Sequence, residues 1–356
     1  MSKYILVINP GGTTSKLGLF DGEKCIHQEK VIHSDCDIEA IPRIADQRAV
    51  RLKPVREFLK GRGFQKGDLL AVVGRGGLLQ PLASGTYAVN KAMLADLEKA
   101  ARGEHASNLG APMALDIATE FDCPAFIVDP VAVDEMEPVA RFTGVKGVER
   151  QSLSHALNMK AVAKRHARVM GKRYEDMNII VAHMGSGTSL SAHKRGRMID
   201  VINPKDEGPI SGDRAGAVPS TALIDMCFAP GANPKDIKKK LFGDGGLYSL
   251  LGTRDIRDAI ARMEKGDAEA RAVLEAMAYQ VAKYIGEMAT VLKGKVDAIL
   301  LTGGMVFNPP MPEWVRESVE WIAPVTFYPG EDELQALAEG ALRALNGEEP
   351  VKTYGA

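Results

Sequence analysis

The stretches ILVINPGGTTSKLGLF (residues 5–20) and IIVAHMGSGTSLSAH (residues 179–193) follow one pattern, about half a chain apart. In each, a β-branched apolar run leads to a polar residue, then to a turn of glycine, threonine and serine, and then to a second strand-like run. Asn9 in the first copy corresponds to His183 in the second. Such a turn presents backbone N–H groups and hydroxyls at one point, which suits phosphate oxygens. The repeat predicts two similar domains that face one nucleotide across a cleft.

Length and composition describe an ordinary globular protein without a strong electrostatic field. The chain has 356 residues, which favours two domains. Its hydrophobic fraction is 45%, its charged fraction is 26% and its formal net charge is −1. A chain this close to neutral lacks the basic surface that accompanies nucleic-acid binding, so we expect no nucleic-acid partner.

Cysteine spacing and hydropathy indicate a reducing, aqueous compartment. Cys25, Cys36, Cys123 and Cys227 are scattered, with no CxxC pair and no cysteine–histidine cluster, which argues against a disulfide framework and a zinc site. No apolar run approaches the length of a membrane span, and the run near the N-terminus is too short for a signal peptide. We therefore expect a cytoplasmic protein with no membrane partner.

Apolar periodicity predicts strands and helices that alternate along the chain. Strands are predicted at 4–8, 16–20, 24–32, 69–73, 125–128, 179–182, 190–193, 198–202, 298–302 and 325–327. Helices are predicted at 91–101, 111–121, 154–170, 221–226, 255–263, 267–292 and 333–345. Asn90, Asn108, Ser152 and Thr253 stand where helix N-caps belong.

The order of these elements predicts the domain organisation. The segment EPVARFTGVKGVERQ (137–151) is polar and contains glycine, so we place a boundary there. The expected domains are residues 1–150 and 151–331, and a last helix, at about 332–346, is expected to pack back on the first domain. Each half opens with hairpins and continues with helix–strand units, which predicts mixed sheets flanked by helices. The expected fold class is α/β, with the ligand site in the cleft between the domains.

The two glycine turns supply the candidate phosphate-binding residues. The first set is Asn9, Gly11, Gly12, Thr13, Thr14, Ser15 and Lys16, and the second set is His183, Gly185, Ser186, Gly187, Thr188 and Ser189. Glycine allows close approach of the backbone to a ligand, and hydroxyls and lysine supply hydrogen-bond donors. A glycine-rich turn with exposed hydroxyls explains either set alone about as well. The match of the two sets in type, flanks and position favours a nucleotide.

Two arginines and an aspartate stand at strand ends or in glycine-rich loops. Arg75 follows an apolar run within VVGRGG, and Arg214 lies in GDRAG. An arginine in such a place neutralises a transferring phosphoryl group, although a solvated surface arginine is the commoner case. Asp129 follows AFIV, where an aspartate either orients Mg²⁺ or its water, or caps a turn before Pro130.

Three further residues are candidates with a structural alternative. His155 opens an amphipathic helix in SLSHALNMKAVAKRHA, where a histidine contacts a phosphoryl group or lies on the helix surface or in the core. Gly303 and Gly304 end a strand in LTGGM. Paired glycines permit close approach to a flat group such as adenine, or form a tight strand–helix turn.

Five stretches resemble the acetate and butyrate kinase family of the actin-like and sugar-kinase superfamily, and the butyrate kinase branch in particular. They are NPGGTTSK (9–16), FTGVKGVERQSLSHALNMKAVA (142–163), VAHMGSGTS (181–189), DEGPISGDRAG (206–216) and FYPGEDELQALAEGALRALNGEE (327–349). The resemblance implies duplicated actin-like (ribonuclease H-like) domains. It also implies ATP-dependent, Mg²⁺-assisted and reversible phosphorylation of a short-chain carboxylate to an acyl phosphate, in short-chain fatty acid metabolism.

The resemblance also implies a role for individual residues. Asn9 and Lys16 match the first phosphate hairpin, and His183, Gly185 and Ser186 match the second phosphate loop. Arg75 and Arg214 match the catalytic arginines, His155 the phosphoryl-stabilising histidine and Asp129 the magnesium-linked aspartate. Two stretches depart from the pattern: GGMVFNPP places Phe307 where a second magnesium-linked acidic residue is expected, and HASNLGAP has no histidine in register, although His105 and Asn108 are near.

The chemistry of the implied reaction explains which residue types it needs. A carboxylate has an unperturbed pKa of about 4 and is ionised at neutral pH, so it attacks without a general base. The protein must therefore align two anions and neutralise the transferring phosphoryl group. Residue patterns leave the acid open among butyrate, isobutyrate, propionate and acetate, and we expect the substrate to be butyrate or a branched C4 acid. We expect the protein to form a homodimer or higher homo-oligomer.

Two other functions remain open at this point. One is an acetate or propionate kinase, against which the butyrate-type stretches argue. The other is an ATP-gated actin-like binding module, which usually carries an extra peptide-binding domain for which 356 residues leave little room.

Overall fold

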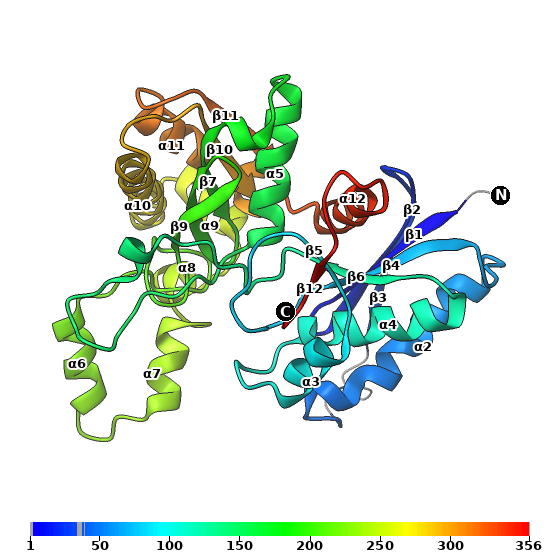
Figure 1. Ribbon diagram of the computed structural model, residues 1–356. Coiled ribbons are helices and arrows are strands. Elements are labelled where there is room, and N and C mark those ends of the chain that lie inside the picture. Colours follow the sequence, from blue (N-terminus) through cyan, green and yellow to red (C-terminus); the bar gives the residue numbers. More distant parts are fainter. Residues whose placement is uncertain (1–2, 34–37, 39, 356) are drawn as a thin grey trace. The chain divides into compact units, whose positions relative to one another are not determined.

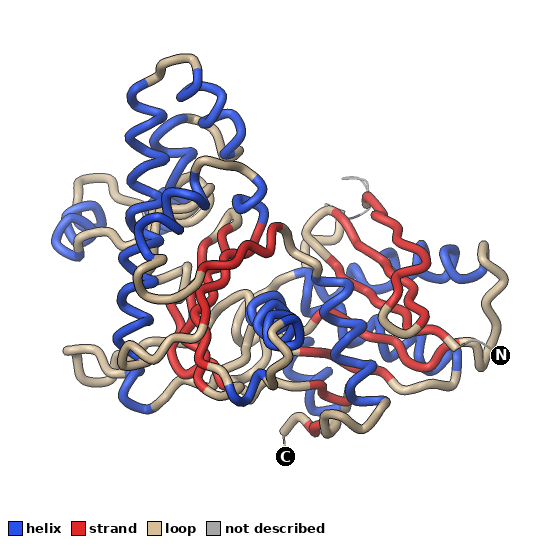
Figure 2. The backbone as a smooth tube through the Cα atoms, turned by 90° about the horizontal axis from the view of Figure 1, so that it is seen from above, coloured by secondary structure: helices blue, strands red, loops and turns tan. Residues whose placement is uncertain are grey.

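The computed structural model describes residues 3–33, 38 and 40–355 and divides the chain into two units. Unit 1 comprises the chain up to Val133 together with the stretch from Asp332 onward, and unit 2 comprises Asp134–Glu331. The units are described separately below. Each is an α/β unit built on one mixed sheet (Figures 1 and 2).

Unit 1 is built on a seven-stranded sheet in the order β12-β5-β6-β4-β1-β2-β3. Its strands are β1 (Tyr4–Pro10), β2 (Thr14–Asp21), β3 (Lys24–Ile32), β4 (Leu69–Arg75), β5 (Thr86–Ala88), β6 (Ala125–Val128) and β12 (Lys352–Thr353). Its helices are η1 (Ile44–Gln47), α2 (Arg48–Lys60), α3 (Lys91–Lys99), η2 (Ala106–Leu109), α4 (Gly110–Phe121) and α12 (Glu333–Leu345). Strands β1, β4 and β6 are parallel neighbours, while β1, β2 and β3 form an antiparallel meander.

Alternating side chains in β1 explain why helices cover both faces of this sheet. Leu6 and Ile8 pack with Leu59 of α2 and Met113 of α4 on one face. Helix α12 contacts β1, β4 and β6 (Figure 1). Because side chains of a strand point alternately to opposite faces, a run that is apolar throughout, as ILVI is, needs a helix on each side.

Unit 2 is built on a five-stranded sheet in the order β11-β10-β7-β8-β9. Its strands are β7 (Asn178–Met184), β8 (Thr188–Lys194), β9 (Arg197–Ile202), β10 (Ala298–Gly303) and β11 (Val325–Pro329). Its longer helices are α5 (Ala156–Val169), α6 (Ser220–Phe228), α7 (Pro234–Leu241), α8 (Gly246–Leu251), α9 (Ile256–Glu264), α10 (Ala268–Val291) and α11 (Met311–Val319). Short 3₁₀ helices are η3 (Pro138–Arg141), η4 (Tyr174–Asp176) and η5 (Gly304–Phe307).

The β7 strand shows the same alternation in unit 2. Ile179 and Val181 pack with residues of α5 such as Met159, whereas Ile180 and Ala182 pack into the core with α10. Helices α6 and α7 differ from the others, because neither has a buried residue in the structure. The core of unit 2 therefore consists of the sheet with α5 on one face and α8–α11 on the other.

All ten predicted strands and all seven predicted helices are present, with ends shifted by a few residues. Helices α2, α7, α8 and α11 and the short strands β5 and β12 were missed. Helix α2 contains Pro54, which argues against a helix interior, and it buries the charged Arg51 on its apolar face. Strands of two or three residues carry too few side chains to show an alternation.

Contacts divide the chain after Val133, whereas the sequence placed the boundary between residues 150 and 151. The intervening segment bonds to unit 2. Glu135 pairs with Lys160 of α5 at 2.6 Å, and Arg150 pairs with Asp200 of β9 at 2.9 Å. A polar segment that contains glycine has the composition of a linker, but here ion pairs attach it to unit 2. The last helix, α12, belongs to unit 1.

One of the four expected helix caps is present as predicted. The Asn90 side chain accepts a hydrogen bond from the Met93 amide at the start of α3. Asn108 instead lies inside η2, and the N-cap positions of α5 and α9 are His155 and Asp255 rather than Ser152 and Thr253. A side chain with an oxygen acceptor indicates that a helix begins nearby, but the geometry of the turn decides which residue occupies the N-cap position.

Cys25, Cys123 and Cys227 are free thiols, as expected, and Cys36 lies outside the described residues. Within the described ranges, the structure contains no helix with both the length and the apolarity that crossing a bilayer needs.

His193 of β8 is fully buried in unit 2 and should make the stability of this unit depend on pH. Its ring contacts the hydroxyls of Tyr174 and Ser191, both at 2.6 Å. Burial, and then the charge of Lys160, lowers the pKa of His193 well below its ordinary value. The unfolded chain therefore takes up a proton below pH ~6.5 that the folded chain does not, so stability falls as the pH falls.

We predict that His193→Gln weakens this acid dependence. For one proton the slope difference is at most about 1.4 kcal/mol per pH unit. Urea unfolding at pH 7.5 and 5.5, followed by tryptophan fluorescence, measures it, because Trp314 and Trp321 both belong to unit 2. If the free energy of unfolding changes equally with pH in the variant and in the original chain, His193 is excluded as the cause.

Candidate functional site

In unit 1, three predicted site residues stand at the carboxyl ends of adjacent parallel strands. Asn9 belongs to the end of β1, Arg75 ends β4, and Asp129 follows β6. The register pairs Ile8 with Gly74 and Arg75 with Val128. Because parallel strands end at the same edge of a sheet, the three polar side chains come from one edge. We call this group, with Glu333, the strand-end cluster.

Glu333, the first residue of α12, joins two of these strand ends. Its Oε2 accepts a hydrogen bond from Asn9 Nδ2 at 2.6 Å, and its Oε1 pairs with Arg75 Nη1. The side chains of Arg75 and Glu333 are 16% and 13% exposed, so solvent screens this pair less than a surface ion pair. Sequence analysis did not single out Glu333, because its contacts come from residues more than 250 positions away.

His105 approaches the same cluster. It precedes η2, where its Nδ1 accepts a hydrogen bond from the Ser107 amide. Partial loss of water around the ring, and then the charge of Arg75, lowers the pKa of His105, while Glu333 acts in the opposite direction. The sequence analysis noted His105 only as a residue out of register, whereas in the structure the charge of Arg75 contributes to the lowered pKa of its ring.

Asp129 is held tightly. Its side chain is buried, and Oδ1 accepts hydrogen bonds from Ser84 Oγ at 2.6 Å and from the Gly85 amide at 2.7 Å. Its φ is +38°, a left-handed conformation that is uncommon for a residue other than glycine. Such strain concentrates at functional sites, where the surrounding structure holds the residue in place.

The first glycine turn follows Asn9. It is closed by a hydrogen bond from the Gly11 amide to the Thr14 carbonyl at 2.7 Å. Gly12 and Thr13 are exposed at the tip. Lys16 on β2 pairs in register with Asn9 on β1. Ser15 is buried and contacts His33, so it supports the hairpin from inside.

In unit 2, the corresponding position carries a pair of stacked histidines. His183 of β7 contacts Asn158 Oδ1 through Nδ1 at 2.8 Å and Glu331 Oε1 through Nε2 at 3.0 Å. The ring of His155 stacks on that of His183 with centroids 3.9 Å apart, and its Nδ1 contacts Ser189 Oγ at 2.9 Å. Asn158 and Glu331 are therefore further site residues that the sequence analysis missed.

The second glycine turn lies against these groups. A Cβ on Gly185 would come within 3.2 Å of Glu331 Oε1 and 3.3 Å of His183 Nε2, so a side chain there would crowd the histidine. The Arg214 side chain lies about 3.9 Å from the position that a Gly187 Cβ would occupy. The structure thus groups Arg214 with the second turn. Thr188 is buried at the start of β8 and is not exposed to solvent.

A cavity of about 670 Å³ opens beside the second turn, entirely within unit 2. It is lined by Gly185, Ser186, Arg254, Asp255, Ile256, Arg257, Gly304, Met305, Phe307 and Asn308. This volume falls in the range of ligand pockets, about 300–1,000 Å³. Gly304 lines the cavity, with open space where its Cβ would stand. Gly303 does not line it: its φ is +98°, and its backbone packs against Met184.

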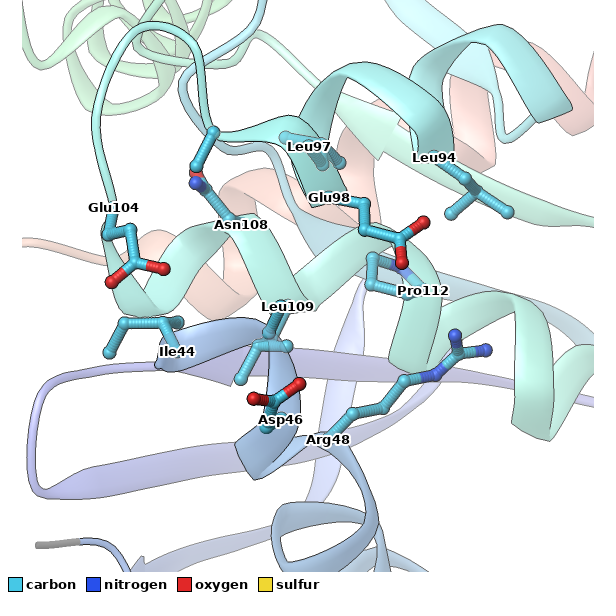
Figure 3. Close-up of a pocket in the computed structure, with 12 residues that line it drawn as sticks. Ile44, Asp46, Arg48, Leu94, Leu97, Glu98, Glu104, Asn108, Leu109 and Pro112 are labelled. Atoms are coloured by element: carbon cyan, nitrogen blue, oxygen red, sulfur yellow. The ribbon is translucent and has the colours of Figure 1, made fainter. Parts of the chain in front are cut away.

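A second, smaller cavity of about 150 Å³ lies in unit 1 between η1, α3 and α4 (Figure 3). Its walls are apolar at Leu94, Leu97 and Leu109, and Glu98 and Glu104 stand at its edge. None of the residues predicted for phosphate or catalysis lines it. The larger cavity of unit 2 therefore matches the predicted ligand site better.

The strand-end cluster fits Mg²⁺ held largely through water. Mg²⁺ typically keeps several waters and uses one or two carboxylates. Asp129 and Glu333 supply two carboxylates at one sheet edge, and Asp129 Oδ1 is already occupied by two donors. Across the described part of the chain, no three histidine, cysteine, aspartate or glutamate side chains gather as a metal-binding group. An all-protein cage is therefore absent from these residues.

Comparison with known proteins identifies the family and the fold of the chain. Residues 141–320, just over half of the chain, match the acetokinase family. The structure is similar to that of an acetate kinase from Porphyromonas gingivalis, with a TM-score of 0.81, 20% identity, and coverage of 96% of this chain and 100% of that one.

Two further structures show the same fold. One is a propionate kinase from Francisella tularensis, with a TM-score of 0.76, 19% identity, and coverage of 95% of this chain and 98% of that one. The other is an acetate kinase from Entamoeba histolytica, with a TM-score of 0.77, 16% identity, and the same coverage of 95% and 98%. The chain therefore has the fold of the acetate and propionate kinases, the actin-like fold that the resemblance of its five stretches implied. The chain belongs to the acetokinase family, and the activity that this membership supports is that of an ATP-dependent carboxylate kinase.

Proposed function

We propose that the chain transfers the γ-phosphoryl group of ATP to a butyrate-type short-chain carboxylate and releases an acyl phosphate and ADP, reversibly. The strand-end cluster carries this proposal, because it sets an arginine and an amide donor beside a glycine turn. A carboxylate oxygen forms the new bond to phosphorus while the bond from phosphorus to the ADP oxygen breaks. No proton moves, because both the attacking and leaving groups are anions.

In unit 1, Asn9 and the amides of the first turn would hold the transferring phosphoryl group. Arg75 would stabilise the charge that spreads over its oxygens in the transition state. In this structure Glu333 pairs with Arg75, so an incoming phosphoryl group would compete for the same guanidinium. His105 would add a neutral donor or acceptor beside Arg75, since its lowered pKa disfavours the charged ring.

In unit 2, the cavity beside the second turn would hold the nucleotide. The turn at Gly185–Ser186 would contact its phosphates, and Gly304 would allow a flat base to approach the backbone. Phe307 lines the cavity with 66% of its side chain exposed, which suits stacking on adenine. His155 and Arg214 would supply further donors to the phosphates.

A magnesium ion would neutralise charge on the phosphate oxygens when it is bound with ATP. Asp129 would orient a water of that ion, and Glu333 is the second carboxylate at the same edge. Phe307, which stands where the resemblance implied an acidic residue, lines the cavity that we assign to the nucleotide.

The choice of acid generates a prediction about turnover. If the acceptor cavity is sized for a propyl or isopropyl group, acetate loses about 0.8 kcal/mol of binding free energy for each missing CH₂. The two missing CH₂ groups together lower kcat/KM by roughly an order of magnitude. A coupled assay of ADP release with acetate, propionate, butyrate and isobutyrate measures this. Acetate or propionate at or above butyrate would assign the alternative acceptor suggested by the similar structures. ATP binding without turnover on any acid would indicate a binding module.

Arg75 and Arg214 should contribute more to the transition state than to nucleotide binding. We expect Arg75→Ala and Arg214→Ala each to lower kcat by about 10²–10³, with a smaller change in the KM for ATP. Arg271→Ala is the matched control, because its guanidinium pairs with Glu275 on the exposed face of α10. Near-normal turnover in either active-site variant would remove that arginine from the mechanism.

Phe307 should affect ATP affinity more than turnover. Base–aromatic stacking is worth about 1–3 kcal/mol, so Phe307→Ala should raise the KM for ATP roughly tenfold while kcat changes little. Trp321→Ala is the control, since Trp321 is an exposed aromatic residue of unit 2 outside the cavity. An unchanged KM would place the adenine elsewhere.

A further inference from the structure

Arg51 is the largest fully buried side chain that the structure describes, and it lies behind the first glycine turn. It belongs to α2, which the sequence analysis missed. Its Nη1 donates to the Gly11 carbonyl at 2.9 Å and its Nη2 to the Gly12 carbonyl at 2.5 Å. One guanidinium therefore binds two successive peptide carbonyls of the turn.

Gln47 holds the guanidinium itself in place. Its Oε1 accepts from Arg51 Nε at 3.1 Å and from Nη2 at 2.9 Å, and its Nε2 donates to the Ile41 carbonyl at 2.9 Å. The planar fork of arginine makes such a two-carbonyl contact, which the point charge of a lysine does not reproduce. We call Arg51 and Gln47 the carbonyl clamp.

Peptide geometry determines where the amides of the turn point once the clamp holds their carbonyls. In a trans peptide the C=O and the following N–H point in opposite directions. The carbonyls of Gly11 and Gly12 point toward Arg51, so the amides of Gly12 and Thr13 point away from it. Gly12 and Thr13 are exposed, and within the described residues neither amide donates a hydrogen bond. Two donors are thus left for an external acceptor.

Charge acts in the same direction as geometry. Every acceptor that binds Arg51 is a neutral carbonyl or amide oxygen, and among the described residues no carboxylate pairs with it. Burial lowers the pKa of Arg51, but an arginine stays protonated at neutral pH. A cation bonded to the carbonyl end of a peptide polarises it and strengthens its N–H as a donor. The clamp therefore favours an anion at the turn.

We propose that Arg51 is a positioning residue that orients the Gly12 and Thr13 amides toward a phosphate dianion, with Gln47 as its support. The inference rests on the proposed function only in taking that anion to be the transferring phosphoryl group. Arg51 itself does not contact the anion, since it lies on the carbonyl side of the turn.

The test compares Arg51→Met, Arg51→Lys and the control Arg56→Met in the full chain. Arg56 lies on the same helix and pairs with exposed Glu120, so its loss leaves the turn unchanged. We expect Arg51→Met to lower kcat/KM for acyl phosphate roughly 10- to 100-fold, which is less than the loss of a direct hydrogen-bond donor would cause. The kcat/KM of Arg51→Lys should lie between those of Arg51→Met and the original chain. The KM for ATP should change little.

Nuclear magnetic resonance of the ¹⁵N-glycine-labelled chain reads the turn directly. Inorganic phosphate should shift the Gly12 amide in the original chain and in Arg56→Met, and shift it much less in Arg51→Met. This readout does not require kinase activity. If phosphate shifts the Gly12 amide in the original chain but not in Arg51→Met, and the original chain is inactive as a kinase, the proposed function is refuted and the clamp is supported. An active chain with the same shift and kinetics in Arg51→Met would overturn the clamp.

Gln47→Leu keeps the test decisive if Arg51→Met does not fold. This variant retains the buried cation but removes the oxygen that orients its plane. We expect a smaller loss, roughly three- to tenfold in kcat/KM, and a weaker phosphate shift at Gly12. Folded Gln47→Leu with unchanged kinetics and an unchanged shift would refute the role of the clamp.

Discussion

The carboxylate of Glu333 constrains the site of unit 1 more than any other single group. It binds Asn9 at the end of β1 and Arg75 at the end of β4, although the three residues are far apart in the chain. Helix α12 packs on the sheet with its first residue at this edge, so the packing of the helix determines where the carboxylate stands. An arginine with a carboxylate partner at low exposure has a defined orientation before any ligand arrives.

Each glycine turn depends on groups behind it. In unit 1 the buried guanidinium of Arg51 holds two carbonyls of the turn, and Ser15 bonds to buried His33 below it. In unit 2 the stacked His155 and His183 are fixed by Ser189 and Asn158. Short turns of glycine are permissive by themselves, so the groups packed behind each turn help to set its orientation.

The sequence predicted ten of the twelve strands that the described residues form, because apolar alternation is a local property of each strand. It also predicted which polar residues follow them, including Asn9, Arg75 and Asp129. It did not predict α2, since Pro54 argues against a helix interior and the buried Arg51 interrupts the apolar face. Nor did it find Glu333 or Glu331, which look like ordinary acidic residues near a helix start.

The sequence alone determined the two glycine turns, most strands in their succession along the chain, and the polar residues that follow them, because each is a local pattern of neighbouring residues. Tertiary structure alone decided that Glu333 meets Arg75, that Arg51 lies behind the turn and that the segment after Val133 belongs to unit 2. These contacts join residues tens to hundreds of positions apart. No local pattern encodes them, because they arise from how helices pack on the finished sheets.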